Sequence, residues 1–155
     1  MGGIKLTLKS TGQVMVAKFE VDYYVKIHFI FYVSDFYNSF KAAAFTRKRE
    51  IEQLGGKRIV FCEEIEDLWE INNIIKTKNL LYFKSQNISN YKTVEVCIYS
   101  HSASDGPLGN VEASQYSLSS QTGDNNDKGQ ITLEGWGKID FNFHPENSIL
   151  AFYGL

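Results

Sequence analysis

The stretch Val94-Glu95-Val96-Cys97-Ile98-Tyr99-Ser100-His101-Ser102 joins a short run of β-branched and apolar residues to a polar segment that contains a histidine. A run of this kind is typical of a buried β-strand. Two similar runs precede it, within 23–33 and 57–62, and amphipathic helical patterns separate the three runs. Strands that alternate with helices predict a mostly parallel sheet with right-handed crossovers. The stretch is therefore the expected third strand of an open α/β sandwich with helices on both faces.

Local signals mark the ends of the two predicted helices. Residues 34–35, Ser and Asp, offer caps to a helix that extends to Leu54, and Gly55-Gly56 supplies the left-handed residue that closes many helices. The glutamates within 63–66 place negative charge in the first turn of a second helix, where the helix dipole favours it. These signals predict one complete β-α-β unit followed directly by the next helix.

The flanking regions complete the expected architecture. Runs at 4–8 and 13–21 predict extra N-terminal strands added at the edge of the sheet. Residues 102–129 are rich in Gly, Ser, Asn and Asp and predict a long polar loop that is either functional or mobile. The apolar run 148–153 predicts a final strand. We expect the whole chain, residues 1–155, to form a single α/β domain.

Composition limits the functional classes. The chain has 155 residues, 43% of them hydrophobic and 22% charged, with a net charge of −2, so it has no strong field to attract nucleic acid. Its longest apolar stretch is well short of the ~20 residues that span a bilayer, so we expect no membrane span. The two cysteines, Cys62 and Cys97, lie in apolar runs and are expected to be free thiols. Without an export signal, we expect a cytoplasmic protein, or one secreted without a classical signal peptide.

His101 is the most informative titratable residue, because it follows a predicted buried strand. The carboxyl ends of strands are where sites form in open α/β sheets. An imidazole titrates near neutral pH and suits a general acid or base, and Asp105, Ser100 or Ser102 could orient it. The alternative is that these residues simply open a polar loop.

A nucleophile to accompany His101 is harder to find. Cys97 is four residues away, which places it roughly 13 Å from His101 along an extended strand. Cys62 is expected on the far side of the first strand of the sheet, and no Gly-x-Ser-x-Gly elbow occurs. The three histidines are dispersed rather than at zinc-ligand spacing, so no metal and no cofactor is predicted.

Two segments together resemble the caspase-like (clan CD) cysteine peptidase superfamily, which includes bacterial relatives in toxins and effectors. Residues 94–102 resemble the block in which a hydrophobic strand leads to the catalytic histidine, with Ser102 where those proteins often carry Gly. Residues 148–154 resemble the block in which the next strand leads to the catalytic cysteine, but position 155 is Leu. The resemblance implies that the two strands are parallel neighbours, which would bring His101 within roughly 10 Å of Gly154 or Leu155. It implies that His101 is the catalytic histidine; together with the residues around it, we expect His101 and Asp105 to be catalytic and Ser100, Ser102 and Gly154 to bind substrate.

The missing cysteine leaves three interpretations open. The chain is truncated before its nucleophile, it is a degenerate relative that does not catalyse, or the pattern is a coincidence. The leading hypothesis is a caspase-like hydrolase-type domain, part of a bacterial effector or toxin, that lacks a competent nucleophile in this chain. The alternative is a non-catalytic interaction module that uses the strand ends and the loop 102–129 to bind a protein or peptide partner. The oligomeric state is not predicted.

Overall fold

Four parallel strands form the centre of the molecule in the computed structural model. The structure describes the backbone of residues 2–10 and 13–21 and the whole of residues 24–111, 116–117 and 129–154. The strand order in the main sheet is β4-β3-β5-β7, and the short strand β6 adds antiparallel to the end of β5. The strands of this sheet are β3 (Val25–Val33), β4 (Arg58–Ile65), β5 (Tyr91–Ala103), β6 (Gly106–Leu108) and β7 (Ile149–Gly154).

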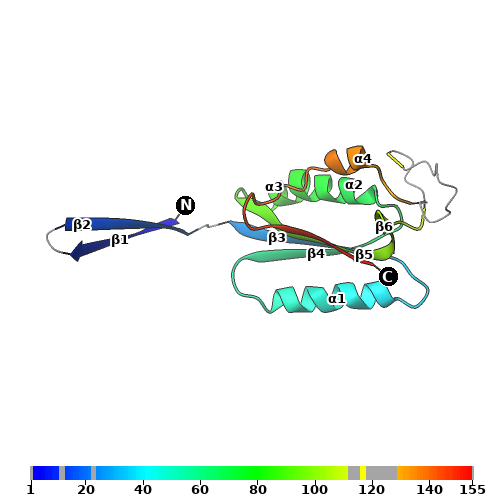
Figure 1. Cartoon of the computed structure of the whole chain (residues 1–155), viewed down its shortest axis with the longest axis horizontal. Coiled ribbons are helices and arrows are strands. Elements are labelled where there is room, and N and C mark those ends of the chain that lie inside the picture. Colours follow the sequence, from blue (N-terminus) through cyan, green and yellow to red (C-terminus); the bar gives the residue numbers. More distant parts are fainter. Residues whose placement is uncertain (1, 11–12, 22–23, 112–115, 118–128, 155) are drawn as a thin grey trace.

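Helices cover both faces of this sheet. Helix α1 (Ser39–Glu52) lies on one face, and the other helical segments lie on the opposite face (Figure 1). These segments are α2 (Glu70–Thr77), the π-helical turn η1 (Lys78–Tyr82), α3 (Phe83–Ser85) and α4 (Leu133–Gly137). The predicted fold class, an open α/β sandwich with a mostly parallel sheet, is confirmed.

The alternation of side chains along β3 divides the core between the two faces. Phe29 and Phe31 belong to the larger cluster, which includes Ile71 of α2 and Phe83 of α3. Ile30 and Tyr32, which alternate with these residues along β3, belong to the smaller cluster beneath α1. A strand buried on both faces explains why residues 25–33 form an almost continuous apolar run rather than an alternating one.

The N-terminal strands differ from the expectation. β1 (Gly2–Ser10) and β2 (Gln13–Val21) are strands, but they pair only with each other in a separate antiparallel sheet and are not added to the edge of the main sheet. In Figure 1 this hairpin lies beyond the beginning of β3, away from the helices. The register runs from Gly2↔Val21 to Ser10↔Gln13, so each strand of the hairpin has a hydrogen-bonding partner along one of its two edges.

The acidic segment after residue 62 also differs from its prediction. Residues 63–65 continue β4, because Glu63, Glu64 and Ile65 pair with 31–33 of β3, and the helix begins only at Glu70. The Glu70 carboxylate accepts hydrogen bonds from the backbone N–H groups of Glu66 (2.7 Å) and Asp67 (2.8 Å), which fixes that start. In the loop predicted at 102–129, residues 106–108 form a hairpin with β5, and 112–115 and 118–128 lie outside the described residues.

Candidate functional site

His101 lies in the last part of β5, on the exposed end of the sheet where the parallel strands finish. Its ring packs edge-on against Phe40 of α1, with ring centroids 5.0 Å apart and an interplanar angle of 83°. Phe40 is itself buried, so one side of the imidazole is held by the core beneath α1 while the residue remains exposed. His101 is therefore held on one side by packing and is open to solvent, so its imidazole is accessible to a bound molecule.

A carboxylate that was not predicted, that of Asp35, is near enough to His101 for their charges to interact. Asp35 follows β3 and accepts hydrogen bonds from the backbone N–H groups of Ser39 (3.0 Å) and Phe40 (3.2 Å) at the start of α1. Desolvation raises the pKa of Asp35, but these two hydrogen bonds outweigh it and lower the pKa, with a smaller contribution from the charge of His101. Asp105 instead accepts a hydrogen bond from Gln130 Nε2 at 2.7 Å. In sequence Asp35 is recognisable only as a helix cap, and no local signal pairs it with a histidine 66 positions later.

The end of β7 lies directly beside the end of β5. The strands are parallel, and their register pairs Tyr99 with Tyr153 and Ser100 with Gly154. The predicted parallel neighbourhood of the two strands is confirmed, and it places His101 one residue beyond the partner of Gly154. Neighbouring strands are about 4.8 Å apart, which agrees with the expected proximity of His101 and Gly154.

The three residues expected to bind substrate, Ser100, Ser102 and Gly154, lie close together, but their accessibility to solvent differs. Ser100 is buried, and its hydroxyl donates to the carbonyl of His101 at 2.8 Å. Ser102 is exposed and packs against Gly154, where an added Cβ would lie 2.6 Å from the Ser102 Cβ. Gly154 thus permits a close approach between the ends of the two strands, and Ser102 is the hydroxyl that remains accessible.

Neither cysteine can act as a nucleophile for His101. Cys97 is fully buried four residues earlier in β5, and Cys62 lies in β4, with β3 between it and β5. Burial raises the pKa of the Cys97 thiol to about 12, with a further contribution from the charge of Glu95. Burial likewise raises the pKa of the Cys62 thiol to about 11. Both thiols are protonated at neutral pH, and both are free as predicted.

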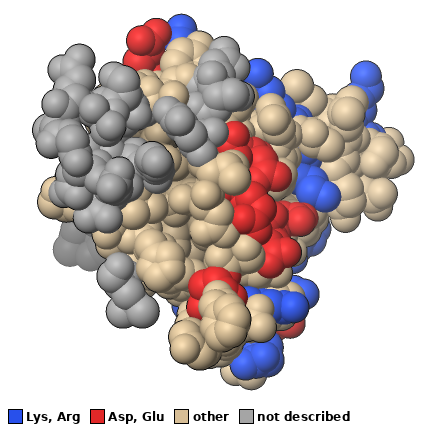
Figure 2. All heavy atoms as spheres, turned by 90° about the vertical axis from the view of Figure 1, so that its right-hand side faces the viewer, with Lys and Arg blue, Asp and Glu red and all other residues tan. Residues whose placement is uncertain are grey.

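A polar cluster at the same end of the sheet was not predicted. Asn110 Nδ2 donates to the Ser34 carbonyl (2.8 Å) and to Glu66 Oε2 (2.6 Å), and the Ser34 hydroxyl donates to the other Glu66 oxygen. Hydrogen bonds from Ser34 and Asn110 lower the pKa of Glu66 and keep it ionised. The cluster ties the ends of β3 and β4 to the segment after β6. Figure 2, which faces this end of the molecule, shows acidic side chains gathered on it, and such a surface disfavours phosphate groups.

His28 has a structural environment that differs from that of His101. It is buried in β3, with Nδ1 3.1 Å from Glu95 Oε1 and Nε2 2.9 Å from Arg58 Nη1. A guanidinium only donates, so Nε2 must accept and Nδ1–H must donate to Glu95. Glu95 also accepts from Arg47 Nη2 at 2.6 Å, which connects the sheet to α1. Both ring nitrogens of this imidazole are occupied, so His28 is part of the scaffold.

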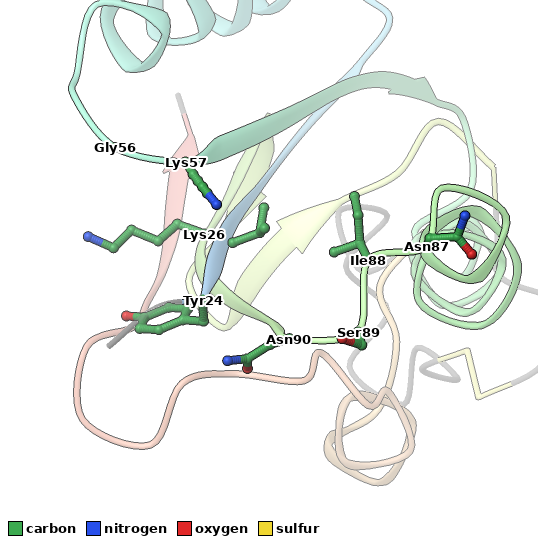
Figure 3. A pocket seen from close by; sticks show the side chains of 9 residues that line it. Tyr24, Lys26, Gly56, Lys57, Asn87, Ile88, Ser89 and Asn90 are labelled. Atoms are coloured by element: carbon green, nitrogen blue, oxygen red, sulfur yellow. The ribbon is translucent and has the colours of Figure 1, made fainter. Parts of the chain in front are cut away.

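A pocket with a volume of about 540 Å³ lies at the opposite end of the sheet, where the strands begin (Figure 3). Residues 24–26, 56–57 and 87–90 line it, and its cationic groups are Lys26 and Lys57. Ligands of open α/β sheets bind at the carboxyl ends of the strands, so this position is not the expected one for catalysis. The pocket is also separated from His101 by the length of the sheet, and we do not assign it to the same site.

Comparison with protein-family models, with curated protein sequences and with solved structures finds no match to this chain. Within the described part of the chain, none of the helices has the length and apolar character needed to cross a membrane. No group of three or more metal-ligating side chains occurs among those same residues. The geometry around His101 is therefore the basis for inferring the function.

Proposed function

We propose that this chain carries the histidine half of a caspase-like cysteine hydrolase site, in which the partner thiol belongs immediately after the end of β7. The observation that carries the proposal is the parallel pairing of β5 and β7, with Gly154 opposite the residue before His101. Gly154, the last described residue of β7, therefore lies on the strand next to that of His101. The resemblance of residues 94–102 and 148–154 to the two catalytic blocks implies the same arrangement.

The chemistry of such a pair is acyl transfer to a thiol. His101 takes the proton of the thiol, and the thiolate attacks a peptide carbonyl to form a carbon–sulfur bond. The amine then leaves as the carbon–nitrogen bond breaks and receives the proton from the imidazolium. Water subsequently hydrolyses the thioester and restores the thiol. The Asp35 carboxylate, which its hydrogen bonds hold ionised, is near enough to His101 for their charges to interact.

Position 155 is Leu, so this chain does not itself supply the thiol at that place. A non-catalytic interaction module is therefore the second candidate, and one further observation favours it. Phe36 and Tyr37 follow β3 at the same end of the sheet and are 91% and 82% exposed, with their rings 5.0 Å apart. Exposed aromatic pairs are typical anchors for a protein or peptide partner. Both candidates use the surface around His101.

Installing the thiol tests the proposal. We compare the unchanged chain, Leu155→Cys, Leu155→Ser and the double variant Leu155→Cys with His101→Ala, each treated with a peptidyl chloromethyl ketone and analysed by intact mass. We expect labelling of the single Leu155→Cys variant to be about tenfold or more faster than labelling of the double variant, because a positioned imidazole activates a thiol. The unchanged chain and the Leu155→Ser variant serve as controls and should not be labelled at this rate. Equal labelling with and without His101 would overturn the hydrolase proposal and favour the interaction module.

A further inference from the structure

Strand β7 leaves one edge of the main sheet open. It pairs with β5 on one side, and no other described strand pairs with it. Its large side chains are exposed on both faces of the sheet, with exposed fractions between 38% and 57%. They are Ile149, Leu150, Phe152 and Tyr153. The edge therefore presents unpaired backbone groups together with apolar side chains.

The usual devices that keep an edge strand from pairing are missing from β7. Charged residues, proline and bulges protect natural edges, because each interrupts a regular ladder or makes it repulsive. Residues 148–154 contain no charged residue and no proline. The register with β5 runs without interruption from Ile149 to Gly154, so the strand has no bulge. A regular and neutral edge of this kind is a template for another strand.

We propose that this edge pairs with β7 of a second copy of the chain, antiparallel and centred on Ala151. Two-fold symmetry requires the pairing to be antiparallel, because the same patch on each copy must contact its counterpart. In this register Leu150 lies opposite Phe152 of the second copy, and Ile149 lies opposite Tyr153 of the second copy. Each pair shares one face of the sheet, since directly opposed residues project to the same side.

The composition of the strand is why a second copy fits this edge. Aliphatic residues occupy one half of β7 and aromatic residues the other, so antiparallel pairing sets an aliphatic against an aromatic side chain at every large position. Such cross-strand pairs are stabilising, and like charges, which usually oppose self-pairing, are absent from residues 148–154. Small residues fall where close approach is needed, with Ala151 at the centre and Gly154 opposite Ser148.

The expected affinity is modest. One pair of six-residue strands buries less than the roughly 800 Å² per partner of a standard interface, so we expect dissociation in the micromolar range. The ends of the two β7 strands point in opposite directions in this dimer. Each copy therefore keeps its own His101 surface free.

Sedimentation velocity of the full chain at several concentrations tests the dimer. We compare the unchanged protein with Phe152→Lys and Ile149→Lys, which place a charge on opposite faces of the edge. The matched control is Leu133→Lys in α4, since Leu133 is 90% exposed and does not belong to β7. Circular dichroism establishes that each variant is folded. The expected result is a concentration-dependent dimer whose dissociation constant rises about tenfold or more in both edge variants and is unchanged in the control.

Three results would overturn the proposal. They are a monomer at every concentration, a dimer that both edge variants leave intact, and a dimer that disappears only when residues 1–21 are deleted, which would assign pairing to the hairpin. None of the edge variants changes His101 or position 155, so these results are independent of the proposed function.

Discussion

The Arg47–Glu95 pair is expected to be the strongest polar link between α1 and the sheet. Glu95 is buried in β5, and Arg47 donates to both of its carboxylate oxygens, through Nη2 at 2.6 Å and Nε at 3.3 Å. His28 supplies the third hydrogen bond to this carboxylate. Arg47→Met keeps most of the aliphatic stem and removes the guanidinium, which leaves a buried carboxylate with one partner. Breaking a buried pair in this way costs about 3–5 kcal/mol, and since the Arg47 side chain is 31% exposed we expect about 2–4 kcal/mol.

The pH dependence of this loss follows from the Glu95 pKa. In the unchanged protein burial raises that pKa, but hydrogen bonds from His28 and Arg47 outweigh burial and lower it. The pairing therefore stabilises the fold above about pH 4.3, the ordinary value for Glu, and is lost as the pH falls through the lower folded value. Without Arg47 burial dominates and the folded pKa rises. As the pH falls, protonation of Glu95 removes the unpaired buried charge from the Arg47→Met variant. The difference in stability between the variant and the unchanged protein is therefore largest near pH 7 and shrinks toward pH 4.

Urea denaturation at pH 7, 5.5 and 4 measures both effects. Arg49→Met is the matched control, because Arg49 lies on the same helix and its guanidinium contacts only Thr46 among its hydrogen bonds in the described structure. The control should change the free energy of unfolding by less than about 0.5 kcal/mol. A loss below about 1 kcal/mol for Arg47→Met, or a loss that is the same at all three pH values, would refute the reasoning.

Three further predictions concern the site. Cys97 should react with iodoacetamide only after unfolding, because it is fully buried and its thiol pKa is raised to about 12, so rapid labelling of the native protein would contradict its placement in the core. Asp35→Ala should lower the midpoint of urea denaturation, because it removes the two hydrogen bonds to the start of α1. Asp35→Asn should lower the midpoint less, since the amide oxygen can still accept one of these bonds. Equal midpoints in the two variants and the unchanged protein would refute the capping role. Gly154→Ala should destabilise the protein, because the new Cβ is forced against Ser102. Adding Ser102→Gly should restore part of the lost stability in the double variant. If the two changes in the free energy of unfolding are additive, the residues do not touch.

The fold could be predicted because its strongest signals are local and repeated. Buried parallel strands give continuous apolar runs, and residues 25–33 and 94–99 are of this type. The runs predicted β5 and β7 as strands, but their parallel pairing was expected only from the resemblance to the caspase-like superfamily. The glutamates of 63–66 misled the prediction, because negative charge near a helix start and charge on the exposed end of a strand look alike in sequence. The true helix start depends on the Glu70 side chain reaching back to two backbone N–H groups, which no periodicity reveals.

The site was only half predictable for a related reason. His101 follows a strong strand signal, so its position at the strand end was accessible from sequence. The proximity of Asp35 was not accessible, because it depends on the parallel pairing of β3 with β5, which brings together residues 66 positions apart. Asp105 is nearer in sequence, but the β5–β6 hairpin carries it to Gln130. The Ser34–Glu66–Asn110 cluster likewise joins three segments that only the tertiary fold brings together.

The most direct test of the central claim is the thiol pKa at position 155. In Leu155→Cys, the pH dependence of alkylation by iodoacetamide gives this pKa, and the same measurement in the double variant with His101→Gln gives the value without an imidazole. A thiol beside an imidazolium is stabilised as the thiolate, so we predict a pKa about one unit or more below the ordinary value of about 8.5, and a return to that value when His101 is replaced. The same pKa in both proteins would contradict the claim that the ends of β5 and β7 form a histidine–thiol site.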